Sequence, residues 1–259
     1  MFSPIRTLST IDLAIQNSMV SFRRYLELVK NVKKDLKTPK LGIEKEIKIE
    51  NLTFFYDERK HKIFNELNIE LKKGEIVQII GDNGTGKTTL IDLILNLLEV
   101  KKGSIKLDNV KVDDIDDFSL QKIVGIVPQN IYLFSETVRN NIKVGRDIND
   151  KKILRLAKEL NFDDIVKSEG INLETFIFNN GGNLSGGQKQ KICILRALIG
   201  EPALLILDEA DAYLDVKSKL NFYNFIKNTK DDRITVFVSH KEQPFLKPDR
   251  IISLPNSNL

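Results

Sequence analysis

The spacing of hydrophobic and polar positions changes several times along this chain of 259 residues. Between residues 10 and 36, apolar residues recur every three or four positions, which predicts one long helix with a narrow apolar seam that ends at Thr38-Pro39. The positions of this seam are Ile11, Ile15, Met19, Phe22, Leu26 and Val29. From 41 to 74, apolar and polar residues instead alternate, as in 47–54 and 67–71, which predicts strands of an antiparallel layer.

The rest of the chain alternates between short apolar runs and helical periods. The runs at 75–80, 203–207 and 234–239 read as buried strands, and 88–98 and 189–198 read as helices. Residues from about 130 to 185 read as mostly helical, most clearly at 153–160. Strands that alternate with helices predict an α/β fold with a helical subdomain inserted into it.

A glycine-rich stretch with the spacing G-x-x-x-x-G-K-[ST] joins the strand at 75–80 to the helix at 88–98. Glycines let the backbone turn and approach a phosphate, and amides at the helix N-terminus point at the anion. Lys87 would contact the β- and γ-phosphates, and the Thr88 hydroxyl would bind Mg²⁺. The stretch therefore predicts a site for ATP and Mg²⁺. Its candidate nucleotide-binding residues are Gly81, Asn83, Gly84, Thr85, Gly86, Lys87, Thr88 and Thr89.

Two carboxylates follow the apolar run at 203–207. Because a charged group inside a sheet is costly, Asp208 and Glu209 should lie where the strand emerges, which is the edge where open α/β sheets bind ligands. Asp208 is placed to hold the Mg²⁺ shell through water. Glu209 is placed to polarise the attacking water as a catalytic base.

A second glycine motif, Leu184-Ser185-Gly186-Gly187-Gln188, precedes the helix at 189–198. Amides at a helix N-terminus favour an anion, so Ser185, Gly186, Gly187 and Gln188 are candidate phosphate contacts, although the motif also reads as an ordinary helix cap. Because the first loop already serves one ATP, a second anion site implies an ATP held between two copies of the domain.

These motifs together resemble those of the ATP-binding cassette (ABC) family, specifically the nucleotide-binding domain of an ABC exporter, over nearly the whole chain. The resemblance implies a P-loop NTPase core with an antiparallel β subdomain and an inserted helical subdomain. It also implies that Tyr56 stacks on adenine, that Gln129 senses Mg²⁺ and water near a transmembrane partner, and that Asp215 reaches across a dimer. His240, after the strand at 234–239, matches the histidine that contacts the γ-phosphate.

The sequence departs from the exporter pattern at two places. In the stretch 175–181, where exporters typically carry Thr-x-x-Gly-Glu-x-Gly, Phe178 replaces the middle glycine and Asn179 replaces the glutamate that couples hydrolysis to membrane helices. In the segment after Glu209, Asp211, Ala212 and Tyr213 stand where the family usually has Thr-Ser or similar small residues. Neither departure removes a residue that would contact ATP.

Composition limits the other classes of function. Charged residues make up 29% and hydrophobic residues 41%, which is an ordinary balance for a globular domain. The net charge is +4, and the sequence contains no basic stripe interleaved with aromatic residues, so we expect no nucleic-acid partner. The one cysteine, Cys193, excludes an internal disulfide and reads as a packed thiol. No apolar run reaches the length of about 18 residues that suggests a membrane span.

Three interpretations of the helix at 10–36 remain open: self-association, binding to a membrane surface, and the cytoplasmic end of a transmembrane bundle. The resemblance favours the last, so that residues 1–40 end the last transmembrane helix and 41–259 form the ATPase domain. The expected partners are then a second nucleotide-binding domain and a transmembrane domain, at the cytoplasmic face of the cell membrane. The alternatives are the ATPase subunit of an importer and a soluble ABC ATPase outside transport.

Overall fold

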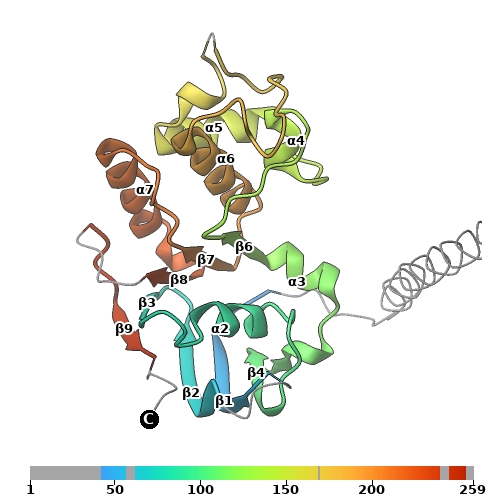
Figure 1. Ribbon diagram of the computed structural model, residues 1–259, viewed down its shortest axis with the longest axis vertical. Coiled ribbons are helices and arrows are strands. Elements are labelled where there is room, and N and C mark those ends of the chain that lie inside the picture. The colour runs from blue at the N-terminus through green and yellow to red at the C-terminus, as the bar shows by residue number, and fades with distance from the viewer. Residues whose placement is uncertain (1–41, 57–61, 169, 240–244, 255–259) are drawn as a thin grey trace, which may run out of the picture. The chain divides into compact units, whose positions relative to one another are not determined.

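The computed structural model describes residues 42–56, 62–168, 170–239 and 245–254. The chain divides into two units, Met1–Pro39 and Lys40–Leu259, and the described residues all belong to the second. This unit combines two sheets with helices in an α/β fold (Figure 1). The helix expected at 10–36 and His240 lie outside the described residues.

An antiparallel sheet of four strands has the order β2-β1-β4-β5. Its strands are β1 (Glu46–Phe54), β2 (Phe64–Lys72), β4 (Lys102–Leu107) and β5 (Val110–Lys111). Ile47 pairs with Leu71 on one side and Leu107 on the other, and all three side chains are buried. The antiparallel layer predicted from 41–74 is thus confirmed, and β4 and β5 extend it.

A parallel sheet of five strands has the order β6-β7-β8-β3-β9. Its strands are β3 (Ile76–Ile80), β6 (Val124–Val127), β7 (Leu204–Asp208), β8 (Ile234–Ser239) and β9 (Arg250–Ser253). Residues of β7 point alternately to opposite faces of the sheet. Leu204 and Ile206 join one hydrophobic core, and Leu205 and Leu207 join the other.

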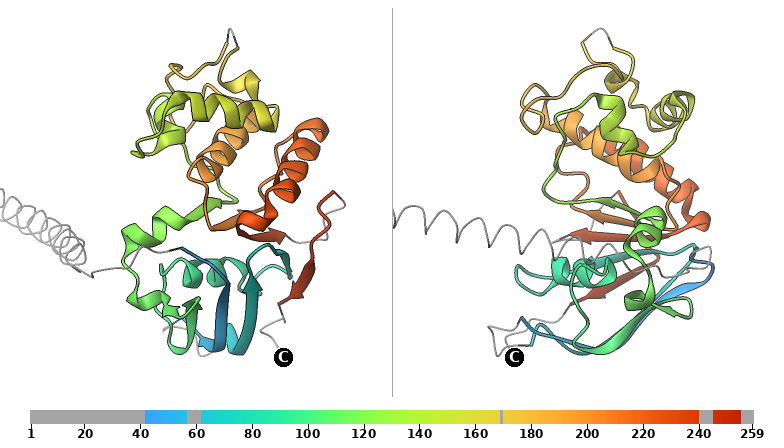
Figure 2. Two further views of the ribbon diagram at one scale, coloured as in Figure 1. Left: turned by 180° about the vertical axis from the view of Figure 1, so that it is seen from behind. Right: turned by 90° about the vertical axis from the view of Figure 1, so that its right-hand side faces the viewer.

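The helices cover the two faces of the parallel sheet. Helix α2 and the antiparallel sheet share one core with one face, and α4 to α7 share the other core with the opposite face (Figure 2). The α-helices are α2 (Lys87–Ile94), α3 (Asp117–Ile123), α4 (Val138–Lys143), α5 (Asp150–Leu160), α6 (Gly186–Leu198) and α7 (Val216–Asn228), and the 3-10 helices are η1 (Val112–Asp114), η2 (Asp163–Ile165) and η3 (Lys230–Asp232).

Two helices differ in length from the prediction. Helix α2 ends at Ile94 rather than 98, because Asn96 adopts a left-handed conformation with φ of 57°, and Leu97 is 69% exposed. Helix α6 begins three residues earlier than predicted, at Gly186. Cys193 within it is buried, and burial raises the pKa of its thiol, as expected of a packed cysteine.

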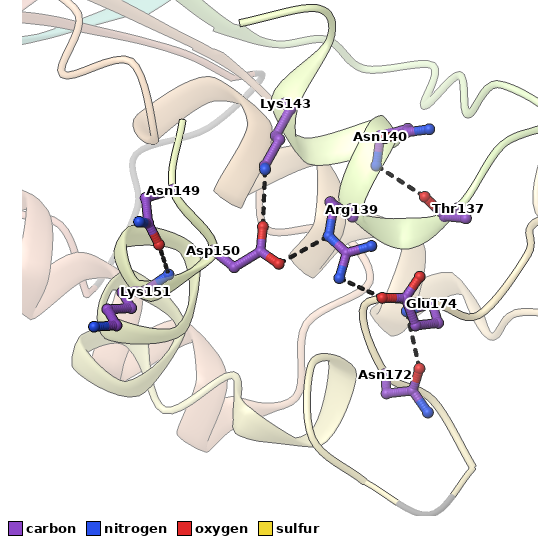
Figure 3. A network of polar contacts seen from close by, with 9 residues as sticks. All are labelled: Thr137, Arg139, Asn140, Lys143, Asn149, Asp150, Lys151, Asn172 and Glu174. Atoms are coloured by element: carbon purple, nitrogen blue, oxygen red, sulfur yellow. Dashed lines mark hydrogen bonds and ion pairs between the residues drawn. The ribbon is translucent and has the colours of Figure 1, made fainter. Parts of the chain in front are cut away.

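The region between β6 and α6 is less helical than predicted: among its described residues, α4, α5 and η2 are the helical segments and the rest is loop. An ion-pair network ties these loops together around Arg139 of α4 (Figure 3). Its guanidinium donates to Asp150, at 2.9 Å from Nε to Oδ2, and to Glu174. Lys143 and Arg139 together hold the pKa of Asp150 below its usual range. The network joins α4 to the first turn of α5 and to the loop before Thr175.

Candidate nucleotide-binding site

The strand ends that carry the predicted site residues meet at one edge of the parallel sheet. The register pairs Ile80 of β3 with Ser239 of β8, and Asp208 of β7 with Val238. Val127, the last residue of β6, pairs with Leu207. The phosphate loop, the two carboxylates and the segment of Gln129 therefore leave the sheet at the same edge, as expected for ligand sites of open α/β sheets.

The phosphate loop has a conformation that requires glycine. Gly84 and Gly86 have φ of 85° and 94°, in the left-handed region. A Cβ added at Gly86 would stand 2.5 Å from Ile63 Cγ2, whereas one at Gly84 would meet no atom within 4 Å. The backbone of Gly84 is thus open on the side where a side chain would otherwise stand, which suits the close approach of a phosphate.

Lys87 and Thr85 fix the shape of this loop. Lys87 Nζ donates to the carbonyl oxygens of Gly81, at 2.6 Å, and Asp82, at 2.9 Å. The Thr85 hydroxyl donates to Asp82 O at 3.0 Å, and this side chain is buried. Thr85 therefore supports the loop from within, and the Lys87 ammonium lies folded over it, close to where an anion would bind.

A pocket of about 310 Å³ brings most of the predicted site residues together. It is lined by Tyr56, Ile63, Asn83, Gly84, Gly86, Lys87, Thr88, Thr89, Gln129, Asp208 and Glu209. Gly81 and Thr85 belong to the loop but do not line the pocket. Ile63 was missed by the sequence analysis, and its only signal was an apolar residue after the charged stretch 58–62.

Tyr56 closes one side of the pocket. This residue is 40% exposed, and its ring packs edge-on against Phe54, with 5.2 Å between ring centroids. Its hydroxyl lies 3.2 Å from Thr89 Oγ1 in α2. The partly exposed tyrosine leaves room for a planar ligand such as a nucleotide base.

Glu209 has an unusual backbone conformation for a residue other than glycine, with φ of 50°. Its amide donates to Val238 O at 3.0 Å, which holds the residue at the end of β8. Its Oε2 accepts a hydrogen bond from Gln129 Nε2 at 3.0 Å. The carboxylate is therefore oriented by a residue that leaves the neighbouring strand β6, and such strain is common at functional sites.

Ser185, Gly186, Gly187 and Gln188 lie at the N-terminus of α6 and do not line this pocket. Ser185 caps the helix: its Oγ accepts from Gln188 N at 3.2 Å, and Gln188 Oε1 accepts from Ser185 N at 2.8 Å. Asp215 likewise caps α7 through Ser218, with bonds of 2.9 Å to its amide and 2.6 Å to its hydroxyl. These hydrogen bonds hold the pKa of Asp215 below its usual range.

The residues of the pocket fit ATP with Mg²⁺. The open backbone at Gly84 and the ammonium of Lys87 suit phosphate, while the Thr88 hydroxyl and the Asp208 carboxylate are hard oxygen ligands of the kind that Mg²⁺ prefers. Within the described residues, no group of three or more His, Cys, Asp or Glu gathers as a metal site. A pocket with so few protein ligands suits Mg²⁺ that is shared with substrate phosphates.

Comparison with known proteins identifies the family. The sequence profile described as "ABC transporter" matches residues 64–212, more than half of the chain. The chain belongs to the ABC transporter family. It resembles the nucleotide-binding, ATP-hydrolysing domain of the exporters in this family.

Individual ABC relatives agree with this assignment. The putative multidrug export ATP-binding/permease protein YgaD of Bacillus subtilis is 31% identical over 264 residues, covering 100% of the chain and 46% of the relative. The ATP-dependent lipid A-core flippase of Syntrophus aciditrophicus is 31% identical over 98% of the chain and 43% of its own length. The chain thus spans less than half the length of these curated relatives.

A solved structure described as a bacterial Atm1-family ABC exporter with ATP bound matches 99% of the chain and 46% of its own length, at a TM-score of 0.81 and 27% identity. In the part of this ABC domain that the structure describes, no helix is long and apolar enough to cross a membrane.

Proposed function

We propose that this chain binds ATP with Mg²⁺ in the pocket at the edge of the parallel sheet and couples its hydrolysis to export across a membrane. The observation that carries the proposal is the convergence of the phosphate loop, Gln129, Asp208 and Glu209 on one pocket. This arrangement unites a phosphate-binding backbone, oxygen ligands for a cation and an oriented carboxylate. In-line attack of water on a phosphate needs these three elements.

Each pocket residue has a role that follows from its chemistry. Lys87 neutralises phosphate charge, and Thr88, Asp208 and Gln129 hold Mg²⁺ directly or through water. The bound cation would neutralise charge on the phosphates. Glu209 orients the attacking water and accepts its proton, and the hydrogen bond from Gln129 aims the carboxylate. His240, one residue beyond β8, would add a contact to the γ-phosphate.

The N-terminus of α6 serves the ATP of a second copy. Ser185 and the amides of Gly186 and Gly187 form a site that favours an anion, yet they do not line the pocket of their own chain. We infer that two nucleotide-binding domains close head to tail, so that each ATP lies between the phosphate loop of one copy and the α6 N-terminus of the other. Asp215 would lie at the same interface.

A transmembrane domain is the other partner. The multidrug export relative is an ATP-binding/permease protein about twice as long as this chain, since the chain covers 46% of it. We infer that residues 1–40 of this chain form the end of the last helix of its transmembrane domain. Residues 41–259 form the ATPase domain at the cytoplasmic face. Exposed aromatic residues suit apolar contacts at a docking surface. They form two pairs beyond Gln129, Tyr132 with Phe134 and Phe176 with Phe178.

Replacing Glu209 with Gln tests the proposal. The amide retains the shape of the side chain but cannot accept a proton, so we expect turnover to fall by about 10²–10⁴-fold. ATP should still bind and should hold the Glu209→Gln protein as a dimer in size-exclusion chromatography. Wild-type hydrolysis in this variant would contradict the assignment.

Glu201 supplies a matched control. It also has a left-handed backbone, with φ of 51°, but its carboxylate pairs with Lys152 at 2.9 Å and does not line the pocket. Glu201→Gln should therefore hydrolyse ATP at the wild-type rate. An equal loss in both variants would mean that the effect comes from the fold and not from the pocket.

A further inference from the structure

The segment 209–215, which joins β7 to α7 and is here called the bridging loop, connects the pocket to the N-terminus of α6. It begins at Glu209, and hydrogen bonds from Ala212 N to Glu209 O (3.2 Å) and from Leu214 N to Asp211 O (3.1 Å) fold it into consecutive turns. These turns hold Glu209 and Tyr213 in one compact segment.

One side of the bridging loop is fixed on α7. Asp211 is buried, and its Oδ2 lies 3.2 Å from Lys219 Nζ. Tyr223 is buried beside it, and burial together with the Asp211 carboxylate raises the pKa of the Tyr223 hydroxyl. Asp211, which departs from the family pattern, is thus paired with Lys219 and anchors the bridging loop to α7.

The other side of the bridging loop rests on α6 through Tyr213. Although this residue is 60% exposed, a Cβ added at Gly186 would stand 3.0 Å from its Cδ1 and 3.3 Å from its Cγ. A Cβ added at Gly187 would stand 3.1 Å from the Tyr213 carbonyl oxygen. The two glycines therefore leave the space that Tyr213 occupies.

From this contact we propose that Tyr213 is a positioning residue, which fixes the N-terminus of α6 relative to Glu209. The capping box of Ser185 and Gln188 orders the first turn of α6 through bonds within that turn. The ring of Tyr213 supplies a contact between that turn and the loop that follows the catalytic carboxylate. This inference rests on the proposed function, because it assigns α6 to the ATP of a second copy.

Two substitutions at Tyr213 test the role in turnover. Tyr213→Ala removes the ring, and small misplacements of groups that contact the substrate can lower rates by up to about a hundredfold, so we expect kcat to fall by about tenfold or more. The ATP dissociation constant of the monomer should remain unchanged, because Tyr213 does not line the pocket. Tyr213→Phe retains the ring and should keep the wild-type kcat.

Dimer formation provides a second readout. In the Glu209→Gln background, Tyr213→Ala should raise the ATP concentration needed for half-maximal dimer by about tenfold, since the second anion site is no longer held in position. If kcat and dimer formation are the same with Ala as with Tyr, the proposal is overturned. An equal loss with Phe would also overturn it, because the hydroxyl and not the packed ring would then matter.

A double substitution tests the contact itself without nucleotide. Gly186→Ala should lower the melting temperature by about 2–4 °C, the shift that a loss of about 1 kcal/mol produces in a domain of this size. In the Tyr213→Ala background the same substitution should have almost no effect. Gly187→Ala is the matched control. Its added Cβ meets the backbone carbonyl oxygen of residue 213, and this oxygen is present whether residue 213 is tyrosine or alanine.

The ATP-dependent assays and the melting temperatures together separate this inference from the proposed function. If wild-type protein neither hydrolyses ATP nor dimerises with it, the proposed function fails, while the melting temperatures still report on the contact. If Gly186→Ala is equally destabilising in the wild-type protein and in the Tyr213→Ala background, the contact is absent and the inference fails, whatever the ATPase activity.

Discussion

Asn141 holds the segment that follows Gln129 in place, and its removal should be strongly destabilising. Its side chain is fully buried in α4. Its Oδ1 accepts from Phe134 N at 2.8 Å and from Arg196 Nη2 at 2.9 Å. Its amide group donates to the carbonyl oxygens of Phe134, Glu136 and Thr137 at 2.9, 3.3 and 3.1 Å.

Asn141→Leu keeps the approximate size of the side chain but removes all of these bonds. A buried polar group left without its partner costs about 1–3 kcal/mol. Loss of the three shortest bonds leaves the Phe134 amide, the Phe134 carbonyl and part of the Arg196 guanidinium without a hydrogen-bond partner. Arg196 keeps its bonds to the carbonyl oxygens of Asn141 and Tyr132, and the new leucine buries apolar surface. We therefore expect a net loss of about 3–5 kcal/mol, or about 6–20 °C in melting temperature.

Urea denaturation followed by circular dichroism measures this loss. Asn140→Leu is the matched control, because Asn140 is the neighbouring residue on α4 but is exposed, and its side chain bonds to Glu136 at the surface. The control should change the free energy of unfolding by about 0.5 kcal/mol or less. A loss below about 1 kcal/mol for Asn141→Leu would refute the reasoning, because it would mean that water or a shifted backbone replaces the lost bonds.

Three further outcomes are expected. Lys87→Ala should raise the ATP dissociation constant, measured by isothermal titration calorimetry, by about tenfold or more, which corresponds to about 1.4 kcal/mol of binding free energy. Lys111→Ala on β5 is the control and should leave this constant unchanged. Burial raises the pKa of Asp108, but hydrogen bonds from the backbone amides of residues 44–46 outweigh burial, so the pKa in the folded protein is lowered. The stability that these bonds contribute should therefore be lost as pH falls below about 4. Asp108→Asn should weaken this acid sensitivity. Deleting residues 1–38 should leave ATP binding nearly unchanged and reduce self-association without nucleotide; an unfolded product would place that segment in the ATPase core.

Much of the pocket lining could be predicted from the sequence, because the residues that supply it lie in short local motifs. Gly84, Gly86 and Lys87 lie within a few residues of each other, between a strand and a helix whose periods are clear. The carboxylates at 208 and 209 follow directly on a buried run, so their place at the strand end could be inferred without the fold.

Contacts between distant segments could not be predicted in the same way. Ile63 reaches the phosphate loop only because Gly86 has no side chain, and nothing near Ile63 in the sequence indicates this. The contact between Tyr213 and Gly186 likewise depends on how β7 and α6 are placed. The end of α2 was wrong because the apolar period continues through Leu97 and Leu98, while the left-handed Asn96 has already ended the helix.

The strand order has a consequence for how the chain acquires its pocket during synthesis. Strand β3, which leads into the phosphate loop, lies between β8 and β9, the last two strands to leave the ribosome among those that the structure describes. The hairpin of β1 and β2 can form as soon as both have been made, because its pairing is local. A nascent chain that has not yet reached Ile234 has no partner strand for β3 in the parallel sheet. The glycine-rich loop is therefore translated well before β8 and β9, and it can become a nucleotide site only once its partner strands have been made.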